Sequence, residues 1–576
     1  MKNTAILCLS VLSLLFLVGV AQAWQPNGVP ICDLPEEQSQ PSVAFDGRGG
    51  AIFQWCDGRT WPSTDFNAYI QRVDQNGNPL WTADGVRLCS VNSFQPCTPG
   101  HSVLSDGQGG AIGVWSDYRS SNFDIYAQRV DSLGNILWTI SGVLICTASG
   151  SQIWPVILSD GAGGAIIVWF DDRAGGIYAQ RINANGLPLW TPNGVQAAAS
   201  PALPYRGDAP RVPLAVTSDG RGGFVVAWQD HRNSSSNADV YAQRVSANGN
   251  VLWTPSGNPV CTAADNQWWV SLTNAGNIRA TIVWTDRRTG GFEIYAQQLD
   301  STGVPRWTMN GVSVRSATDT TGGTFYPRAV NDGSGGTIVA WMDQRYGQYV
   351  YAQKIDSAGN RQWTTSGTRL FNTPYPSQGA QGIASAISDA TGGAIITTWI
   401  GRYPSPSGTE DVYSQRINPN GNLLWSTQGL VICNAGNDQF EPHAVLTETG
   451  HAIIVWEDYR NQGSNDMDIY AQSTKYLTSH IGGNEKATGF EAKNLLLNIQ
   501  NPVRGKLVLS YTLSRTEIVC LELYDALGCK VKTIFEGPVV KGSHNLKTAL
   551  NIPAGVYFLR LRTGRGEIVN KLAVIR

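Results

Sequence analysis

"SDGQGGAIGVWSDYRSSNFDIYAQRVDSLGNILWTISGVLIC" (residues 105–146) is one copy of a pattern that returns along most of this chain. Two tryptophans mark each copy, and the first one recurs at steps of 54 to 60 residues. It stands at Trp55, Trp115, Trp169, Trp228, Trp284, Trp341, Trp399 and Trp456. The second stands at Trp24, Trp81, Trp138, Trp190, Trp253, Trp307, Trp363 and Trp425. Regular self-similarity of this length is typical of repeat folds.

Each copy predicts four β-strands. A short first strand leads into a D-G-x-G-G turn, in which glycine supplies the positive φ that a tight hairpin needs. The second strand, as in "AIIVW" (165–169), is apolar throughout, which indicates burial on both faces. The third, "DIYAQRVD" (124–131), and the fourth, "ILWTISGVLI" (136–145), follow across an x-G-N turn. Eight such units over residues 24–476 predict an all-β fold, an eight-bladed β-propeller.

The two ends of the repeat region complement each other. The eighth copy (441–476) contains the first three strands and then stops, whereas "WQPNGVPIC" (24–32) matches only the fourth strand. We therefore expect the N-terminal strand to complete the last blade and close the ring, which leaves no open blade edge. An open solenoid is the alternative architecture, and it would need capping units that the sequence does not show.

Composition and the N-terminal segment define the class of protein. Residues 1–23 combine one lysine, an apolar run and an A-Q-A end, which predicts a secretory signal peptide. No other stretch is long and apolar enough to span a bilayer. The net charge is −2 without basic blocks, so nucleic acid and anionic membranes are poor partners.

Five cysteines share one repeat position, at Cys32, Cys89, Cys146, Cys261 and Cys433. Equivalent positions in successive repeats lie far apart, so these cysteines cannot pair with one another. We expect small buried thiols there rather than a disulfide framework.

A second domain follows the repeats. Residues 477–494 read as a polar linker, and residues 495–576 alternate strand-like runs with turns, as in a small β-sandwich. Its motifs are Asn501-Pro502 with Gly505, "LELYDALGCKV" (521–531), "GSHNL" (542–546), "IPAGVYFLRL" (552–561) and the closing "KLAVIR". They resemble the C-terminal sorting domain of type IX secretion and the similar immunoglobulin-like domain of flagellar hook-capping proteins. The repeats themselves resemble those of uncharacterised exported repeat proteins. The resemblance implies an immunoglobulin-like fold, contact with the type IX machinery, and an extracellular or outer-membrane surface location.

Polar residues that recur in the copies favour a structural role. W-x-D-x-R occurs in seven copies, and we expect its Asp to cap a turn while its Arg pairs with it or with a neighbouring blade. A glutamine recurs in the third strand of all eight copies, where it would satisfy backbone groups. A ring of cation-binding or acid–base carboxylates is the alternative. No cofactor is expected apart from calcium, for which loop carboxylates are candidates. These are Asp124, Asp239, Glu293, Asp411 and Asp468.

The candidate binding residues are aromatic side chains that lie outside both tryptophan series or enter first strands. Aromatic faces at a channel mouth can stack on sugar rings or hold peptide side chains, whereas the alternative is packing between blades. The candidates are Trp61, Trp154, Trp268, Trp269, Tyr326 and Phe440.

Enzyme signatures are missing from the sequence. It contains no G-x-S-x-G, H-E-x-x-H, phosphate-loop or dinucleotide motif, and its six histidines are scattered, so we assign no catalytic or metal-binding residue. The sequence predicts a secreted or surface binding protein for a glycan or a protein. A carbohydrate-active hydrolase or lyase with its site at the channel mouth is the alternative, and a structural role in an extracellular layer is the third.

Overall fold

The computed structural model describes residues 24–576, apart from a set of shorter segments. Those segments are residues 60–65, 99, 200–213, 235, 316–321, 373–382, 402–408, 462–466, 481–495, 500–502, 514–516, 525–529, 551, 564–565 and 576. The predicted signal peptide and the predicted linker, beyond its first residues, lie outside the described residues. The chain divides into two compact units, Met1–His480 and Ile481–Arg576.

The described part of the first unit contains eight four-stranded antiparallel sheets, an arrangement consistent with an eight-bladed β-propeller. The first strands are β2 (Gln38–Phe45), β6 (Val103–Ser105), β10 (Gln152–Ser159), β14 (Ala215–Ser218), β18 (Gln267–Asn274), β22 (Thr324–Asn331), β26 (Ile383–Ser388) and β30 (Gln439–Leu446). The second strands are β3 (Ala51–Asp57), β7 (Ala111–Asp117), β11 (Ala165–Asp171), β15 (Phe224–Asp230), β19 (Ala280–Asp286), β23 (Thr337–Asp343), β27 (Ala394–Gly401) and β31 (Ala452–Asp458).

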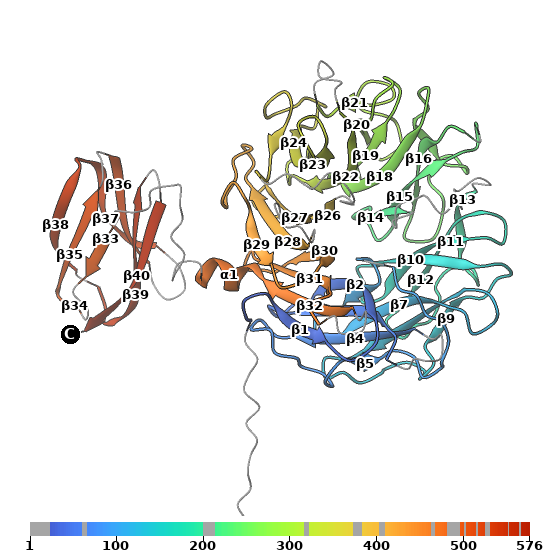
Figure 1. Cartoon of the computed structure of the whole chain (residues 1–576), viewed down its shortest axis with the longest axis horizontal. Coiled ribbons are helices and arrows are strands. Elements are labelled where there is room, and N and C mark those ends of the chain that lie inside the picture. The colour runs from blue at the N-terminus through green and yellow to red at the C-terminus, as the bar shows by residue number, and fades with distance from the viewer. Residues whose placement is uncertain are drawn as a thin grey trace, which may run out of the picture. The chain divides into compact units, whose positions relative to one another are not determined.

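The third and fourth strands complete each sheet in order. The third strands are β4 (Asn67–Val73), β8 (Asp124–Val130), β12 (Gly176–Ile182), β16 (Asp239–Val245), β20 (Glu293–Leu299), β24 (Tyr349–Ile355), β28 (Glu410–Ile417) and β32 (Asp468–Ser473). The fourth strands are β5 (Val86–Arg87), β9 (Val143–Cys146), β13 (Val195–Ala199), β17 (Asn258–Cys261), β21 (Val312–Ser313), β25 (Thr368–Arg369), β29 (Leu430–Cys433) and β1 (Val29–Cys32). We number the sheets as blades 1 to 8 by their first strands, β2 to β30, several of which lie toward the centre of the ring in Figure 1.

The N-terminal strand closes the ring, as the sequence predicted. In blade 8, β1 pairs with β32 in the order β1-β32-β31-β30, and Val29 lies opposite Ala471. Figure 1 shows the blue β1 beside the orange β32. Trp24 then contacts blade 1, where its indole N–H donates to the carbonyl of Gln75 at 3.0 Å. The N-terminal segment therefore completes blade 8 and also binds blade 1, so it joins the two blades.

The D-x-R motif is the buried polar centre of each regular blade. In blade 3, Asp171 is fully buried and accepts hydrogen bonds from the Trp169 indole at 2.8 Å and from the Arg173 guanidinium at 2.6 Å. The backbone N–H of Arg173 also donates to Asp171, so the carboxylate caps the turn. The guanidinium stacks 4.1 Å from the centroid of the Tyr178 ring and donates to the thiol of Cys146 from the preceding blade. The structural interpretation of D-x-R is confirmed for this blade.

The repeated cysteines and glutamines also serve the framework. Burial raises the pKa of Cys146 to about 11, which keeps its side chain a neutral thiol. The repeated glutamine of blade 1, Gln71, donates to the carbonyl of Thr82 and accepts from the backbone N–H groups of Arg72 and Trp81. Both residue types therefore connect strands within the framework, as expected.

The fourth strand is shorter than the sequence suggested. In blade 2, β9 covers only Val143–Cys146, and the predicted strand residue Trp138 lies in the turn before it. This correction has a physical reason, because the second tryptophan leaves the sheet to cap the next blade. The indole of Trp138 donates to the carbonyl of Ala184 in blade 3 at 3.3 Å. Equivalent bonds join Trp24 to Gln75, Trp81 to Ser132, Trp190 to Ala247, Trp253 to Ser301, Trp307 to Ser357 and Trp363 to Pro419.

A helix that the sequence did not predict leaves the closing blade. The helix α1 (Thr474–His480) follows β32 directly, where the other blades make a turn into their fourth strand. Its Leu477 packs against the same hydrophobic cluster as Trp425 of blade 7. The helix thus contributes to the core between blades 7 and 8.

The second unit is a small β domain with its own core. Its strands are β33 (Leu496–Ile499), β34 (Val503–Arg504), β35 (Lys506–Leu513), β36 (Glu517–Tyr524), β37 (Lys530–Val539), β38 (Gly542–Ala549), β39 (Gly555–Thr563) and β40 (Gly566–Ile575). They form a sheet of order β33-β35-β38 and a sheet of order β34-β40-β39-β36-β37. Leu507, Leu521 and Leu559 are among the residues of its buried core. An immunoglobulin-like assignment remains a prediction.

Deletion of residues 24–32 should abolish cooperative unfolding of the first unit, because β32 would lose its only fourth-strand partner and Trp24 would leave the core. The measurement is a urea unfolding curve followed by tryptophan fluorescence. The exposed Gln25 in the same segment supplies the control, since Gln25→Ala keeps the backbone contacts and should unfold as the wild type does. A cooperative transition in the deletion variant would contradict the role of closure.

Asp171→Ala should lower the free energy of unfolding by about 3–5 kcal/mol, because it leaves the Arg173 guanidinium without its buried partner. The neighbouring exposed Asp172→Ala is the matched control, with an expected change within about 0.5 kcal/mol. Denaturant titration measures both values. Equal effects of the two substitutions would exclude the framework role of the motif.

A variable rim and a candidate binding pocket

The first strands of blades 1, 3, 5, 6 and 8 share a bulge at which the side chains differ from blade to blade. At this bulge the ladder skips residues, for example between Ser39 and Ser42 in blade 1. The bulge residue has a positive φ, which is rare for residues other than glycine and strained for bulky ones. These residues are Gln40 (φ 57), Trp154 (φ 56), Trp269 (φ 52), Tyr326 (φ 52) and Glu441 (φ 45). The backbone is therefore repeated here, whereas the chemistry is not.

Two of these bulge residues, Gln40 and Trp269, bond to the preceding blade at the same position, the middle residue of W-x-D. The backbone N–H of Trp269 donates to the side-chain oxygen of Gln229 in blade 4 at 2.7 Å. In the same way, the backbone N–H of Gln40 donates to Glu457 in blade 8 at 2.7 Å. We call these two positions a rim pair. Variation at rim pairs can change a surface without changing the framework.

Blade 7 departs from the framework, and the predicted position of its tryptophan is wrong. The spacing assigns Trp399 to the first tryptophan series. In blade 1 the tryptophan of this series, Trp55, lies opposite Tyr69, whereas in blade 7 the residue opposite the equivalent Tyr413 is Thr398. One extra residue in the second strand has shifted Trp399 to the rim-pair position. Phe371 fills the place in the core that Trp55 has in blade 1. Its ring lies against Gly429, so that a Cβ at this glycine would be 2.6 Å from the ring, and the Trp55 ring lies against Gly85 in the same way.

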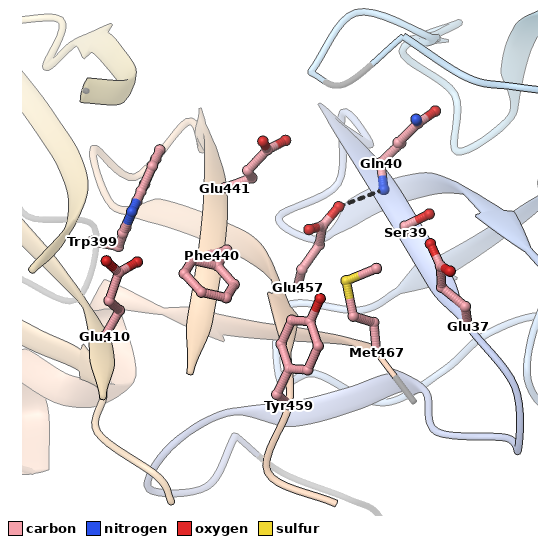
Figure 2. Close-up of a pocket in the computed structure, with 10 residues that line it drawn as sticks. All are labelled: Glu37, Ser39, Gln40, Trp399, Glu410, Phe440, Glu441, Glu457, Tyr459 and Met467. Atoms are coloured by element: carbon pink, nitrogen blue, oxygen red, sulfur yellow. Dashed lines mark hydrogen bonds between the residues drawn. The ribbon is translucent and has the colours of Figure 1, made fainter. Parts of the chain in front are cut away.

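The displaced tryptophan lines a pocket between blades 7, 8 and 1 (Figure 2). The pocket has a volume of about 440 Å³, which is within the range of small-molecule sites. Four carboxylates and three aromatic rings converge on it from separate parts of the chain. The lining residues are Glu37, Ser39, Gln40, Trp399, Glu410, Phe440, Glu441, Glu457, Tyr459 and Met467.

One carboxyl group of the pocket has a raised pKa. Burial, and then the charge of Asp438, raise the pKa of Glu410 from 4.5 to about 7. Its backbone N–H donates to Asp438 at 2.9 Å. Glu457 instead accepts the backbone N–H of Gln40 at 2.7 Å. Near neutral pH Glu410 is thus partly protonated, and the ten lining residues include no lysine, arginine or histidine.

The structure brings three of the predicted site residues together. Trp268, Trp269 and Tyr326 form a cluster across blades 5 and 6, in which the rings of Trp269 and Tyr326 are 4.7 Å apart. Phe292 and Phe325 belong to the same cluster, although the sequence analysis did not select them. We call these five residues the aromatic cluster.

The other predicted site residues are separate. Phe440 lies in the pocket, where its ring meets Tyr459 edge-on at 5.6 Å. Trp154 is 38% exposed and contacts only Phe170 among the ring pairs of the described residues. Trp61 lies outside the described residues. The pocket glutamates were not among the predicted site residues, because no sequence pattern marks them. The register of Trp399, by contrast, can be read from the sequence by counting from Gly392-Gly393 instead of from one tryptophan to the next.

Electrostatic interactions join two histidines and an arginine at or next to first strands, namely His101, His443 and Arg328. Desolvation and the charge of Arg328 lower the pKa of His101 to about 4. Desolvation, His101 and Arg328 lower the pKa of His443 to about 3, and its ring lies against Gly100. Both imidazoles are therefore neutral above pH 5, and neither belongs to the pocket lining.

The calcium hypothesis gains no support from the described residues. Among them there is no group of three or more histidine, cysteine, aspartate or glutamate side chains placed to hold a metal ion. The loop carboxylates proposed for calcium have other partners. Asp239 accepts from Asn233 at 2.7 Å, Asp468 accepts from Asn461 at 2.8 Å, and Glu293 pairs with Arg315.

Residues 501–575 match the secretion system C-terminal sorting domain. The resemblance seen in the sequence is confirmed, and the chain therefore carries a type IX sorting domain. This domain implies interaction with the type IX machinery and export across the outer membrane, to a secreted or cell-surface location. The helices of the described residues include none with the length and apolar character needed to cross a membrane.

Solved structures similar to this chain include three propeller-like neighbours at low identity. A protein of unknown function from Dyadobacter fermentans is 10% identical with a TM-score of 0.36, covering 79% of this chain and 99% of its own. An endo-arabinase from Bacteroides thetaiotaomicron is 13% identical with a TM-score of 0.27, covering 48% and 95%. The NanB sialidase from Streptococcus pneumoniae is 11% identical with a TM-score of 0.31, covering 78% and 70%. No curated protein matches the chain. At these scores the likeness does not assign an activity.

Glu410→Gln should stabilise the protein increasingly as the pH rises from about 4.5 to about 7. The raised pKa means that the native protein holds this proton more tightly than the unfolded chain does. The wild type therefore loses that stabilisation as Glu410 ionises, whereas the neutral amide does not. Urea midpoints of both proteins at pH 4.5 and at pH 8 measure the difference. A gap that does not change with pH would contradict the raised pKa.

Proposed function

We propose that this exported protein binds a neutral or amino-sugar glycan in the pocket between blades 7, 8 and 1, without turning it over. The observation that supports this proposal is the departure of blade 7 from the repeat. That blade loses its core tryptophan and its D-x-R motif, and Trp399 becomes part of the pocket wall. A framework kept in the other seven blades is abandoned where a cavity forms, which favours a ligand-binding role for that cavity.

The chemistry of the lining suits hydroxyl-rich rings. Carboxylates accept charge-assisted hydrogen bonds from sugar hydroxyls. The partly exposed rings of Phe440 and Tyr459 offer apolar faces of the kind that pack on the C–H face of a pyranose. The side chain of Trp399, only 6% exposed, forms a rigid wall rather than a mobile contact. Rigid walls reduce the ordering that a ligand must cause on binding.

The charge of the pocket selects against acidic glycans. Four of the ten lining residues are glutamates, and none of the ten is a lysine, arginine or histidine. A uronate or sulfated sugar would bring like charges within a few ångströms of each other, whereas an amino sugar would gain an opposite charge. We therefore expect neutral and amino sugars to bind and acidic polymers to be excluded.

Hydrolysis of a glycan in the same pocket is the second candidate function. One specific observation favours it, namely the raised pKa of Glu410, about 7, in a pocket that three other glutamates also line. A protonated acid paired with an ionised carboxylate is the arrangement that glycoside hydrolysis uses. In that case Glu410 would protonate the leaving oxygen, and a second glutamate would act as base or nucleophile.

A glycan array probed with the full chain tests the binding proposal. Saturable binding to neutral or amino sugars is expected, and Phe440→Ala should weaken it about 10-fold or more, a loss of about 1.4 kcal/mol. Trp154→Ala is the matched control, because Trp154 is an exposed aromatic residue at the rim but outside the pocket. If Trp154→Ala or Trp269→Ala weakens binding and Phe440→Ala does not, the pocket is not the site.

Turnover separates the two candidates. The wild type should release no reducing ends from glycans that it binds, and Glu410→Gln should bind them as well as the wild type does. Release of reducing ends that Glu410→Gln abolishes would replace the binding proposal with the hydrolase.

A further inference from the structure

Among the described residues of the first unit, two cysteines lie outside the repeated cysteine position. Cys56 stands in the middle of W-x-D in blade 1, and Cys97 precedes β6 in blade 2. Cys97 occupies the place of a bulge residue, because Gln95 bonds back to Val91 as Gln38 bonds back to Leu34. The two cysteines therefore form the rim pair between blades 1 and 2.

These two cysteines are in direct contact. The backbone N–H of Cys97 donates to the sulfur of Cys56 at 2.9 Å. The Cys56 thiol also lies 3.3 Å from the carbonyl oxygen of Gln95, and Gln54 donates to the sulfur of Cys97 at 3.5 Å. Because the N–Cα bond adds only ~1.46 Å, the Cys56 sulfur lies within about 4.4 Å of the Cys97 Cα. A disulfide needs Cα atoms within about 7 Å, and a sulfur this close to the partner's Cα brings the two residues near that range.

We propose that Cys56 and Cys97 form a disulfide that joins blade 1 to blade 2 in the exported protein. The Cys56 sulfur and the Cys97 sulfur form one S–S bond and lose two protons and two electrons. A disulfide-bonded protein oxidant of the exporting compartment accepts the electrons, and its own S–S bond becomes two thiols. Export makes such an oxidant available, since secreted and periplasmic proteins mature under oxidising conditions.

The bond forms before the blades have closed over the two residues. In the folded chain Cys56 is 2% exposed and Cys97 is 4% exposed, so a protein oxidant cannot reach them. Buried thiols of this kind are inert toward exchange. The repeated cysteines differ, because their sulfurs accept hydrogen bonds from the D-x-R arginine, as Cys89 does from Arg119. The inference is independent of any ligand of the pocket and depends only on export.

Peptide mapping of the full chain, exported into an oxidising compartment, tests the proposal. The protein is denatured without reductant, its free thiols are alkylated, and it is digested with trypsin. Residues 49–59 and 88–119 should appear as one linked peptide, lighter by two hydrogen atoms than the separate pair. Reduction should release both peptides.

Serine variants assign the bond, because residues 88–119 contain both Cys89 and Cys97. Cys89→Ser should keep the linked peptide, and Cys97→Ser should lose it and leave Cys56 alkylated. Alkylation of both Cys56 and Cys97 in the wild type would overturn the proposal, and so would a link that persists in Cys97→Ser. If a variant does not fold, fragmentation of the linked wild-type peptide shows whether the bond is at Cys97, as proposed, or at Cys89, which would overturn the proposal.

Discussion

The pairing of β1 with β32 is the constraint on which the rest of the first unit depends. Gln25 and Gln472, 447 residues apart in sequence, are joined by a hydrogen bond at this seam. Without it, blade 8 would present an unpaired third strand, and blade 1 would lose the Trp24 indole that caps it. Once it forms, every blade is packed on two sides, and the eight sheets share one continuous set of contacts. The pocket between blades 7, 8 and 1 exists only because this seam is closed.

Residues that repeat from blade to blade and residues that vary occupy different positions in the fold. The buried carboxylate of the D-x-R motif, as at Asp171, accepts hydrogen bonds from the arginine and the tryptophan of its own blade. These groups are therefore not available to bind a ligand. The rim pairs carry the differences, from Cys56 with Cys97 to Glu457 with Gln40. Because the donor of a rim pair is a backbone N–H, the side chain of the bulge residue can change while the bond survives, as long as the partner position keeps an acceptor. The rim pairs therefore both join neighbouring blades and give each junction its own side-chain chemistry.

The sequence predicted the repeated part of the structure well, because each copy repeats the same physical requirement. Eight tryptophan pairs and the split eighth copy were enough to place four strands per blade and to join Trp24 to the last blade. The pocket could not be predicted in this way. Glu37 and Glu410 are far apart in the chain, and only the closed ring brings them together. Trp399 also resembles a framework residue when spacing alone is counted, and its changed register becomes visible only against its partner strand.

The seam also orders events in time. Its two halves are the first and the last pieces of the repeat region, so the ring cannot be completed until nearly the whole of that region is available. Contacts of such long separation form slowly, since the entropy of a very large loop is lost before any gain is realised. We therefore expect the closed ring to be the last feature of the first unit to form, after the seven blades whose four strands follow one another along the chain.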